Sequence, residues 1–215
     1  MKTFFYVDAF NLYYGALKGT DYRWLNLYEL FTSLFPKNQI VRIKYFTARV
    51  KPHPSDPDKP LRQQLLLRAL ATIPCLDIIE GHFLSHNVWM PLARPAPNEK
   101  CAKVIKTEEK GSDVNLAAHL LFDGFTSAFE CAIVVSGDSD LATPIEMVRN
   151  HLNRPVGVLL PQLLSSNAKN ARRSAKLQTV SSFFREGIRE GVLKASQFPE
   201  TMVDKHGQFR KPGAW

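Results

Sequence analysis

Short apolar runs alternate along the chain with segments of helical periodicity. The runs at residues 3–8, 40–50, 76–81, 131–135 and 156–160 are apolar and bounded by polar, Gly or Pro residues, which predicts buried strands. Apolar residues recur at helical spacing in most segments between them, and predict helices over residues 11–17, 25–35, 60–72, 114–125, 141–150 and 180–192. Strands that alternate with helices are typical of a parallel sheet with right-handed crossovers. The pattern therefore predicts a three-layer α/β fold with helices on both faces of the sheet.

Four segments interrupt this alternation. Residues 51–60 contain four prolines and predict an irregular loop. Residues 83–107, with a Pro-rich centre, predict an irregular hairpin, and residues 165–176 form a polar, basic segment. From residue 199 on, the chain is polar and carries Gly and Pro. We therefore expect one domain over residues 1–198 and a flexible basic tail over residues 199–215.

Composition sets the broad class. A chain of 215 residues, 45% of them hydrophobic, can bury one good core. No stretch approaches the roughly 20 apolar residues that a bilayer-spanning helix needs, so no membrane segment is expected. The three cysteines, Cys75, Cys101 and Cys131, are far apart and form no C-x-x-C pair. A reducing cytoplasm fits them, with all three expected as small core residues.

The formal net charge of +8 points toward a polyanionic partner. Surface Lys and Arg hold phosphates in proteins that bind nucleic acid. Charge alone is weak evidence, because many basic proteins bind no nucleic acid specifically. It gains weight from the acidic residues that follow two of the predicted strands.

Three acidic segments are expected at one edge of the sheet. Asp8 directly follows the first strand, Asp138 follows the strand at 131–135 with Asp140 close behind, and Asp113 begins the helix that leads into that strand. Helix N-termini and strand carboxyl ends share an edge in a βαβ unit, and ligands bind there. Gathered carboxylates repel one another and call for a cation. Oxygen ligands of this kind suit Mg²⁺ or Mn²⁺.

Each acid also has a structural interpretation. Asp113 would serve equally as a helix cap or as a first-turn charge. Asp138 and Asp140 lie in a Gly-Asp-Ser-Asp sequence that favours a turn. Asp8 is harder to explain, because a carboxylate directly after a buried Phe-Phe-Tyr-Val run has little structural purpose. The three segments together are far less probable by accident than any one of them.

The motifs Val-Asp-Ala-Phe-Asn-Leu-Tyr (7–13), Lys-Gly-Ser-Asp-Val (110–114) and Ser-Gly-Asp-Ser-Asp-Leu (136–141) resemble the NYN domain family, including its LabA-like group, which belongs to the PIN-like nucleases. The resemblance covers about residues 3–184. It implies a Rossmann-like PIN fold and cleavage of RNA that depends on Mg²⁺ or Mn²⁺. Carried over by motif, Asp8, Asp113 and Asp138 would bind the metal, and Asp140 would be either a fourth carboxylate at the metal or a residue that supports its ligands.

Five polar residues are candidates for contact with substrate, each beside a structural alternative. Asn11 either faces the same cleft as Asp8 or caps the first helix. Lys110 either contacts a phosphate or is simply solvated, and Ser136 either bonds a metal-bound water or ends its strand. Arg172 and Arg173, in the basic segment, either follow a phosphate backbone or form an ordinary solvated surface.

The predicted function is a metal-dependent phosphodiesterase acting on RNA, with single-stranded DNA left open. Its competitor is a nucleic-acid-binding or regulatory module that keeps the fold without turnover. Haloacid-dehalogenase-like phosphatases need a second acid two positions after Asp8, where this chain has Phe10. A response regulator would need a phosphoacceptor Asp near Gly81, where there is none. The sequence leaves the oligomeric state open.

Overall fold

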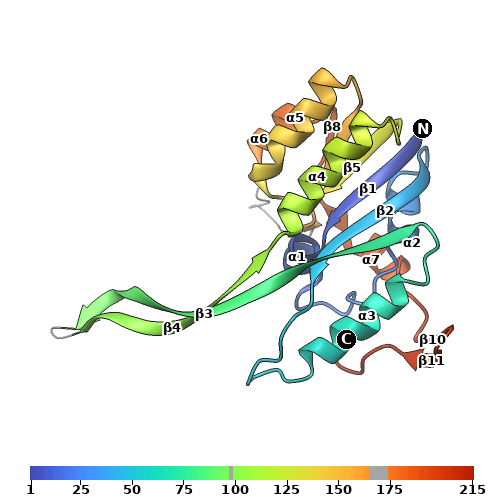
Figure 1. The fold of residues 1–215 in the computed structure, drawn as a ribbon. Helices are drawn as coiled ribbons and strands as arrows, with labels where there is room; N and C mark the ends of the chain where they lie inside the picture. The colour runs from blue at the N-terminus through green and yellow to red at the C-terminus, as the bar shows by residue number, and fades with distance from the viewer. Residues whose placement is uncertain (97–98, 165–173) are drawn as a thin grey trace.

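The computed structural model describes residues 1–96, 99–164 and 174–215. In this part of the chain, seven strands form one sheet in the order β4-β3-β2-β1-β5-β6-β8 (Figure 1). The pairs from β3 to β8 are parallel, and only the β3–β4 pair is antiparallel. The strands of this sheet are β1 (Lys2–Asp8), β2 (Gln39–Ala48), β3 (Leu76–Ala96), β4 (Glu99–Lys110), β5 (Cys131–Val135), β6 (Val156–Leu159) and β8 (Phe183–Arg185). The predicted three-layer α/β fold is confirmed.

Helices cover both faces of the sheet (Figure 1). One face carries α1 (Ala9–Leu12), its π-helical continuation η1 (Tyr13–Leu17), α2 (Leu27–Leu34), α3 (Lys59–Leu70) and α7 (Glu190–Ala195). The other face carries α4 (Ser112–Phe125), α5 (Ala142–His151) and α6 (Ala175–Val180), with the 3₁₀ turn η2 (Ser139–Leu141) leading into α5. The bounds of most predicted strands and helices agree with these elements to within a few residues, but the strand predicted over residues 76–81 continues as β3 to Ala96.

The central strands are apolar throughout because both of their faces are buried. In β1, Phe5 and Val7 pack into the core on the α2 side, whereas Phe4 and Tyr6 pack into the core on the α4 side. Phe5 stacks on Phe31 of α2 with ring centroids 4.2 Å apart. These two cores fix β1 in the middle of the sheet, with its carboxyl end at Asp8.

Strands β3 and β4 continue beyond the sheet as a long two-stranded arm (Figure 1). β3 pairs with β2 as far as Gly81 and then with β4 from His82 on. A Cβ at Gly81 would lie 2.5 Å from the Lys110 carbonyl oxygen, so only glycine fits where the arm begins. The sequence predicts this hairpin but as a separate, irregular element. Cys101, expected in the core, is exposed on the arm, whereas Cys131 is buried.

The predicted helix over residues 180–192 is wrong. The segment contains β8, the short strand β9 (Ile188–Arg189), which pairs with β7 (Leu163–Leu164), and the start of α7. β8 pairs with β6 through Phe183–Arg185 and extends the sheet. A backbone beside an otherwise unpaired strand edge gains ladder hydrogen bonds, and this tertiary gain overrides helical spacing.

The segment after residue 199 contains a hairpin of β10 (Thr201–Asp204) and β11 (Gly207–Arg210). Phe209 is buried in the α2-side core, and Asp204 accepts hydrogen bonds of 2.6 and 2.7 Å from Arg68 of α3. Residues 201–210 are thus packed against the domain. The division of the chain at residue 199 stays a prediction.

Candidate acidic active site

Asp8 and Ser136 are neighbours at the carboxyl edge of the sheet, because β1 and β5 pair in parallel with Val7 opposite Val135. Asp8 is only 3% exposed. One of its oxygens accepts hydrogen bonds from the Asn11 side chain at 2.6 Å and from the Ser136 hydroxyl at 3.0 Å. The other accepts the Asn11 backbone N–H at 2.9 Å. Asp8, rather than Asn11, therefore caps α1.

Asn11 and Ser136 also connect Asp8 to the loop that carries Asp138. The Gly137 N–H donates to the Asn11 side-chain oxygen at 3.2 Å, and the Asp138 N–H donates to the Ser136 hydroxyl at 3.1 Å. Asp138 in turn accepts the Asp140 N–H at 2.9 Å and caps η2. These contacts hold the ends of β1 and β5 in one fixed arrangement.

The N-terminus of α4 brings in Asp113 and an acid that the sequence analysis missed. Gly111 caps the helix with φ +98°, a left-handed conformation that favours glycine. The Glu109 carboxylate accepts the Ser112 N–H at 3.1 Å and its hydroxyl at 2.8 Å. Asp113 is exposed in the first helical turn. The signal that could have identified Glu109 is its position three residues before Ser112, the first residue of α4, where a carboxylate reaches free backbone N–H groups.

The pKa values of Asp8 and Asp113 are raised in this cluster. Burial raises the pKa of Asp8, against the hydrogen bonds from Asn11 and Ser136 that lower it, and the charge of Asp138 raises it further. Although Asp113 keeps an exposed surface, the pKa of its carboxyl is raised to about 6, first by partial loss of hydration and then by the charges of Asp8, Asp138, Glu109 and Asp140, in that order. The carboxylates from β1, α4 and the loop after β5 therefore lie within range of one another's charge.

The donor chemistry of this cluster fits a hard divalent cation. Its side chains offer only oxygen atoms, and their mutual repulsion would be relieved by a positive charge between them. Within residues 1–96, 99–164 and 174–215, no three His, Cys, Asp or Glu side chains are close enough together to form a ready-made metal cage. Asp113 is exposed and Asp138 is half-buried, so their side chains have room to turn toward an ion bound at Asp8.

The remaining candidates lie in different settings. Asp140 is exposed beside Asp138. Lys110, at the end of β4, is half-exposed and forms an ion pair of 3.2 Å with Glu108. Arg172 and Arg173 lie outside the described residues, so their contact with phosphates stays a prediction.

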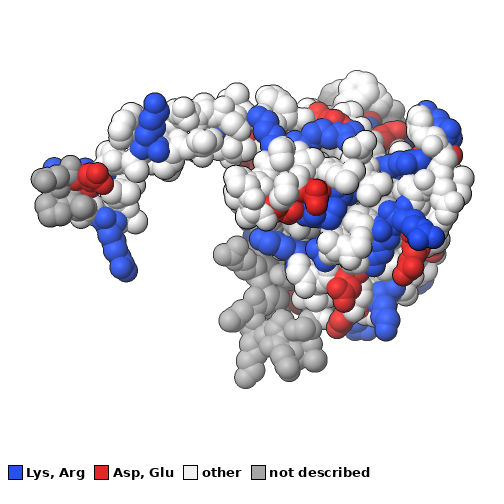
Figure 2. Space-filling view, turned by 90° about the horizontal axis from the view of Figure 1, so that it is seen from below, with Lys and Arg blue, Asp and Glu red and all other residues white. Residues whose placement is uncertain are grey.

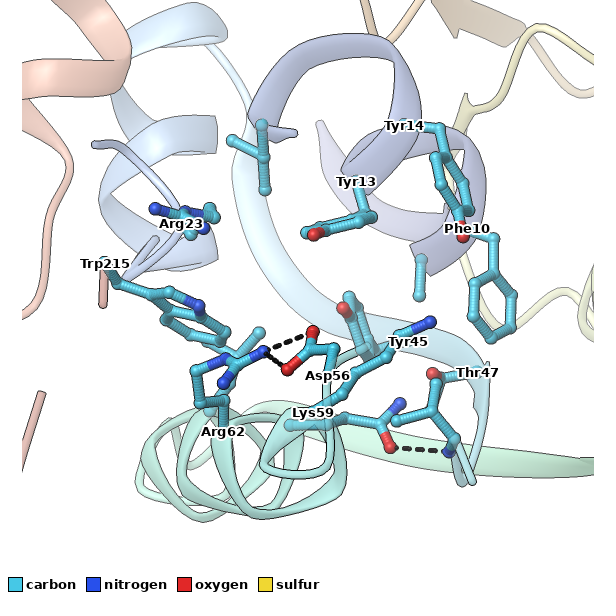
Figure 3. A pocket seen from close by; sticks show the side chains of 15 residues that line it. Phe10, Tyr13, Tyr14, Arg23, Tyr45, Thr47, Asp56, Lys59, Arg62 and Trp215 are labelled. Carbon is cyan, nitrogen blue, oxygen red and sulfur yellow. Dashed lines mark hydrogen bonds and ion pairs between the residues drawn. The ribbon is translucent and has the colours of Figure 1, made fainter. Parts of the chain in front are cut away.

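A groove and a cavity lie on the two sides of α1, and Phe10 and Tyr14 line both. The groove, of about 570 Å³, is also lined by Asn11, Gly137 and Ser139, and so runs past the acidic cluster. The cavity, of about 150 Å³, lies toward α3 and the loop at residues 51–58 (Figure 3). The sequence analysis missed this cavity, because its walls come from segments far apart in the chain.

Asp113→Asn is expected to stabilise the protein at neutral pH in EDTA. A carboxyl with a folded-state pKa near 6 and an ordinary unfolded pKa near 4 costs stability as pH rises from about 4 to above 6, because ionisation is harder in the folded state. The variant should therefore melt at a higher temperature than the wild type at pH 7.5, and at the same temperature at pH 3.5. Melting curves at both pH values check this; an equal difference at both would rule out the charge as its cause.

Among the described residues, every helix is too short or too polar to span a bilayer.

This chain is similar to two known proteins and to one domain family. 6-Hydroxy-3-succinoylpyridine 3-monooxygenase of Pseudomonas putida is 29% identical over 242 residues, which cover all of this chain and 75% of that protein. A crystal structure of a protein of unknown function from Vibrio parahaemolyticus has a TM-score of 0.55 and 16% identity, over 88% of this chain and 93% of that one, and shows the fold alone.

The third likeness is to a domain family. The NYN domain matches residues 2–178, which is most of the chain and includes all three acidic segments. This match agrees with the parallel sheet and with the placement of the motifs on β1, α4 and β5. The chain therefore belongs to the NYN domain family, within the PIN-like nucleases.

Proposed function

We propose that this protein is a ribonuclease that depends on Mg²⁺ or Mn²⁺ and hydrolyses phosphodiester bonds within single-stranded RNA. The observation that carries the proposal is the gathering of Asp8, Asp113 and Asp138 at one sheet edge, where desolvation and the charges of neighbouring acids raise the pKa of Asp8 and of Asp113. Membership of the NYN family supports it. The three cysteines, which form no disulfide among the described residues, fit a cytoplasmic protein.

Asp8, Asp113 and Asp138 would hold the metal, with Asp140 as a further carboxylate. When bound, the ion would orient a water and stabilise the leaving oxygen. Asn11 and Ser136 hold the Asp8 carboxylate in one orientation, since both donate to the same oxygen. Holding a ligand in advance lowers the reorganisation needed when the reaction occurs.

The groove beside α1 is the natural path for the RNA strand toward these acids. Asn11, Gly137 and Ser139 line it, and Lys110 is the last residue of β4, two residues before α4 begins. The loop at residues 51–58 leaves the carboxyl end of β2 at that edge too. We expect Lys110 to contact a phosphate next to the cleaved bond.

The direct test incubates the purified protein with one RNA sequence in linear and circular form, and with the matching single-stranded DNA, in Mn²⁺, Mg²⁺ or EDTA. Cleavage of the circular RNA that requires metal would support the proposal, because only an endonuclease opens a circle. Binding of RNA without cleavage under every metal condition would contradict it and favour a non-catalytic nucleic-acid-binding or regulatory module.

Oxidation of a pyridine ring is a second candidate, since it is the reaction named for the Pseudomonas putida relative. The ring-sized cavity beside α1, with aromatic side chains in its wall, favours it. Oxygen uptake in the presence of 6-hydroxy-3-succinoylpyridine and a two-electron reductant would support this candidate. Metal-dependent RNA cleavage with no oxygen uptake would exclude it.

The arm offers a second surface for the RNA strand. Trp89 is 67% exposed and lies directly across from Lys103, so the two side chains share one face. Figure 2 shows Lys and Arg side chains projecting from the arm beyond the body. An exposed aromatic ring beside a cation is the usual arrangement for stacking a base and contacting its phosphate. A two-stranded arm is also only marginally stable in water without a partner.

Replacing Lys103 with Gln should weaken RNA binding and reduce the slope of log affinity against log salt by about 0.7, the value for one phosphate contact on a single strand. Trp89→Ala should weaken binding without changing that slope. Fluorescence anisotropy at several salt concentrations measures both. Lys194→Gln, an exposed lysine of α7, is the matched control. An unchanged slope in Lys103→Gln would place the arm away from the RNA.

A further inference from the structure

The cavity between α1 and α3 has the size of a single aromatic ring. Its volume is about 150 Å³, and Phe10, Tyr13, Tyr45 and Trp215 contribute rings to its wall (Figure 3). Cavities of about this volume hold one benzene-sized ring, whereas sites for larger ligands begin near 300 Å³. Rings in the wall can stack on, or meet edge-on, a planar guest.

The charges around the cavity favour an anion. Arg23, Lys59 and Arg62 line it, against a single carboxylate, Asp56. One terminal nitrogen of Arg62 donates to both Asp56 oxygens at 2.5 Å, so that pair neutralises itself. Arg23 and Lys59 leave an excess of positive charge at the cavity.

Arg23 has a donor that the protein does not satisfy. Its terminal nitrogen donates to the Ala214 carbonyl at 2.7 Å, and its guanidinium lies 5.8 Å from the centre of the Trp215 ring. Its Nε is buried and has no hydrogen-bond partner among the described residues. Buried donors are nearly always paired, so the protein alone leaves part of the hydrogen-bonding capacity of the Arg23 guanidinium unused at the cavity wall.

The cavity has two chemically different ends, and one adjoins the acidic cluster. Figure 3 shows Arg23, Arg62 and Trp215 at one end, and Phe10, Tyr14 and Thr47 at the other. Phe10 comes two residues after Asp8 and also lines the groove that passes the acids. A ligand in the cavity would thus contact α1, the helix that Asp8 caps.

We propose that this cavity binds a planar aromatic ring that carries an anionic group, with the ring among Tyr13, Tyr45 and Phe10 and the anion at Arg23. Two sources share this chemistry. One is a nucleotide, either free or next to the cleaved bond of an RNA strand, and the other is a free aromatic carboxylate. The proposal requires no metal and no turnover, so it stands or falls apart from the proposed ribonuclease activity.

Isothermal titration in EDTA tests it with four probes: uridine 5′-monophosphate, pyridine-3-carboxylate, uncharged uridine and inorganic phosphate. At least one of the two charged aromatic probes should bind about tenfold or more tightly than both uridine and phosphate. Preference for the monophosphate would identify a nucleotide site, and preference for the carboxylate a site for a free aromatic acid. Binding of phosphate as tight as that of both aromatic probes, or no binding of either, would overturn the proposal.

Arg23→Gln should weaken the preferred probe about tenfold, as expected for the loss of one charge-assisted hydrogen bond. Arg49→Gln is the matched control, since Arg49 is exposed, pairs with Glu80 and does not line the cavity. Tyr13→Leu should also weaken the probe while leaving Arg23 in place, and it serves as the second variant if Arg23→Gln does not fold. Unchanged affinity in a folded Arg23→Gln or Tyr13→Leu variant would place the ligand elsewhere.

Discussion

Asp8→Asn is expected to lower the rate of metal-dependent RNA cleavage by about 10³-fold or more. The substitution keeps the size of the side chain but removes the charge that would bind the ion, and metal catalysis contributes several kcal/mol of transition-state stabilisation. Neutralising Asp8 removes a buried charge but turns one of its two acceptor oxygens into a donor, so we expect a loss of stability of about 1–3 kcal/mol with the fold retained. Single-turnover cleavage in Mn²⁺, together with a melting curve, measures both effects.

The control for this prediction is Asp21→Asn, which changes an exposed acid outside the cluster and should leave the rate unchanged. Calorimetric titration with Mn²⁺ should show weaker binding in Asp8→Asn and wild-type binding in Asp21→Asn. A folded Asp8→Asn variant that cleaves RNA within about threefold of the wild-type rate would remove Asp8 from the site.

Asp123→Ala is expected to destabilise the fold by about 3–5 kcal/mol, the usual cost of breaking a buried ion pair. Asp123 and Lys44 are 6% and 9% exposed, and the Lys44 ammonium donates to the Asp123 carboxylate at 2.5 Å. The hydroxyl of Tyr6, which is fully buried, donates to the same oxygen at 2.7 Å. The variant would leave a buried cation and a buried hydroxyl without this acceptor.

Urea denaturation and a melting temperature lowered by about 10 °C would confirm this loss. The double variant Lys44→Met with Asp123→Leu replaces the pair with apolar groups, and should recover most of the stability. Arg42→Gln, which breaks the exposed pair with Asp77, should cost less than about 1 kcal/mol. A loss as small as this for Asp123→Ala would mean that water reaches the ion pair.

The hydrogen bonds among Tyr6, Lys44 and Asp123 join α4 to β1 and β2. We therefore also expect Asp113, at the start of α4, to be less well positioned in Asp123→Ala.

Much of the acidic cluster could be expected from the sequence, because its elements are local patterns. An apolar run that ends in Asp8 predicts both the strand and the position of the acid at its end. The run at residues 131–135 is confirmed residue for residue as β5, since a strand buried on both faces is apolar throughout. Parallel strands then bring their carboxyl ends to one edge, whatever the distance in sequence.

Tertiary structure alone decided the features that depend on distant partners. Strand β8 forms because the edge of β6 is available for pairing, although the spacing of apolar residues in β8 and around it predicts a helix. The arm forms because β3 exchanges β2 for β4 after Gly81, a change of partner that leaves no periodic signal. The ring-sized cavity joins Tyr13, Tyr45 and Trp215 from three distant segments. Periodicity reports which face of an element is buried, but the neighbour that buries it is chosen only when the whole chain folds.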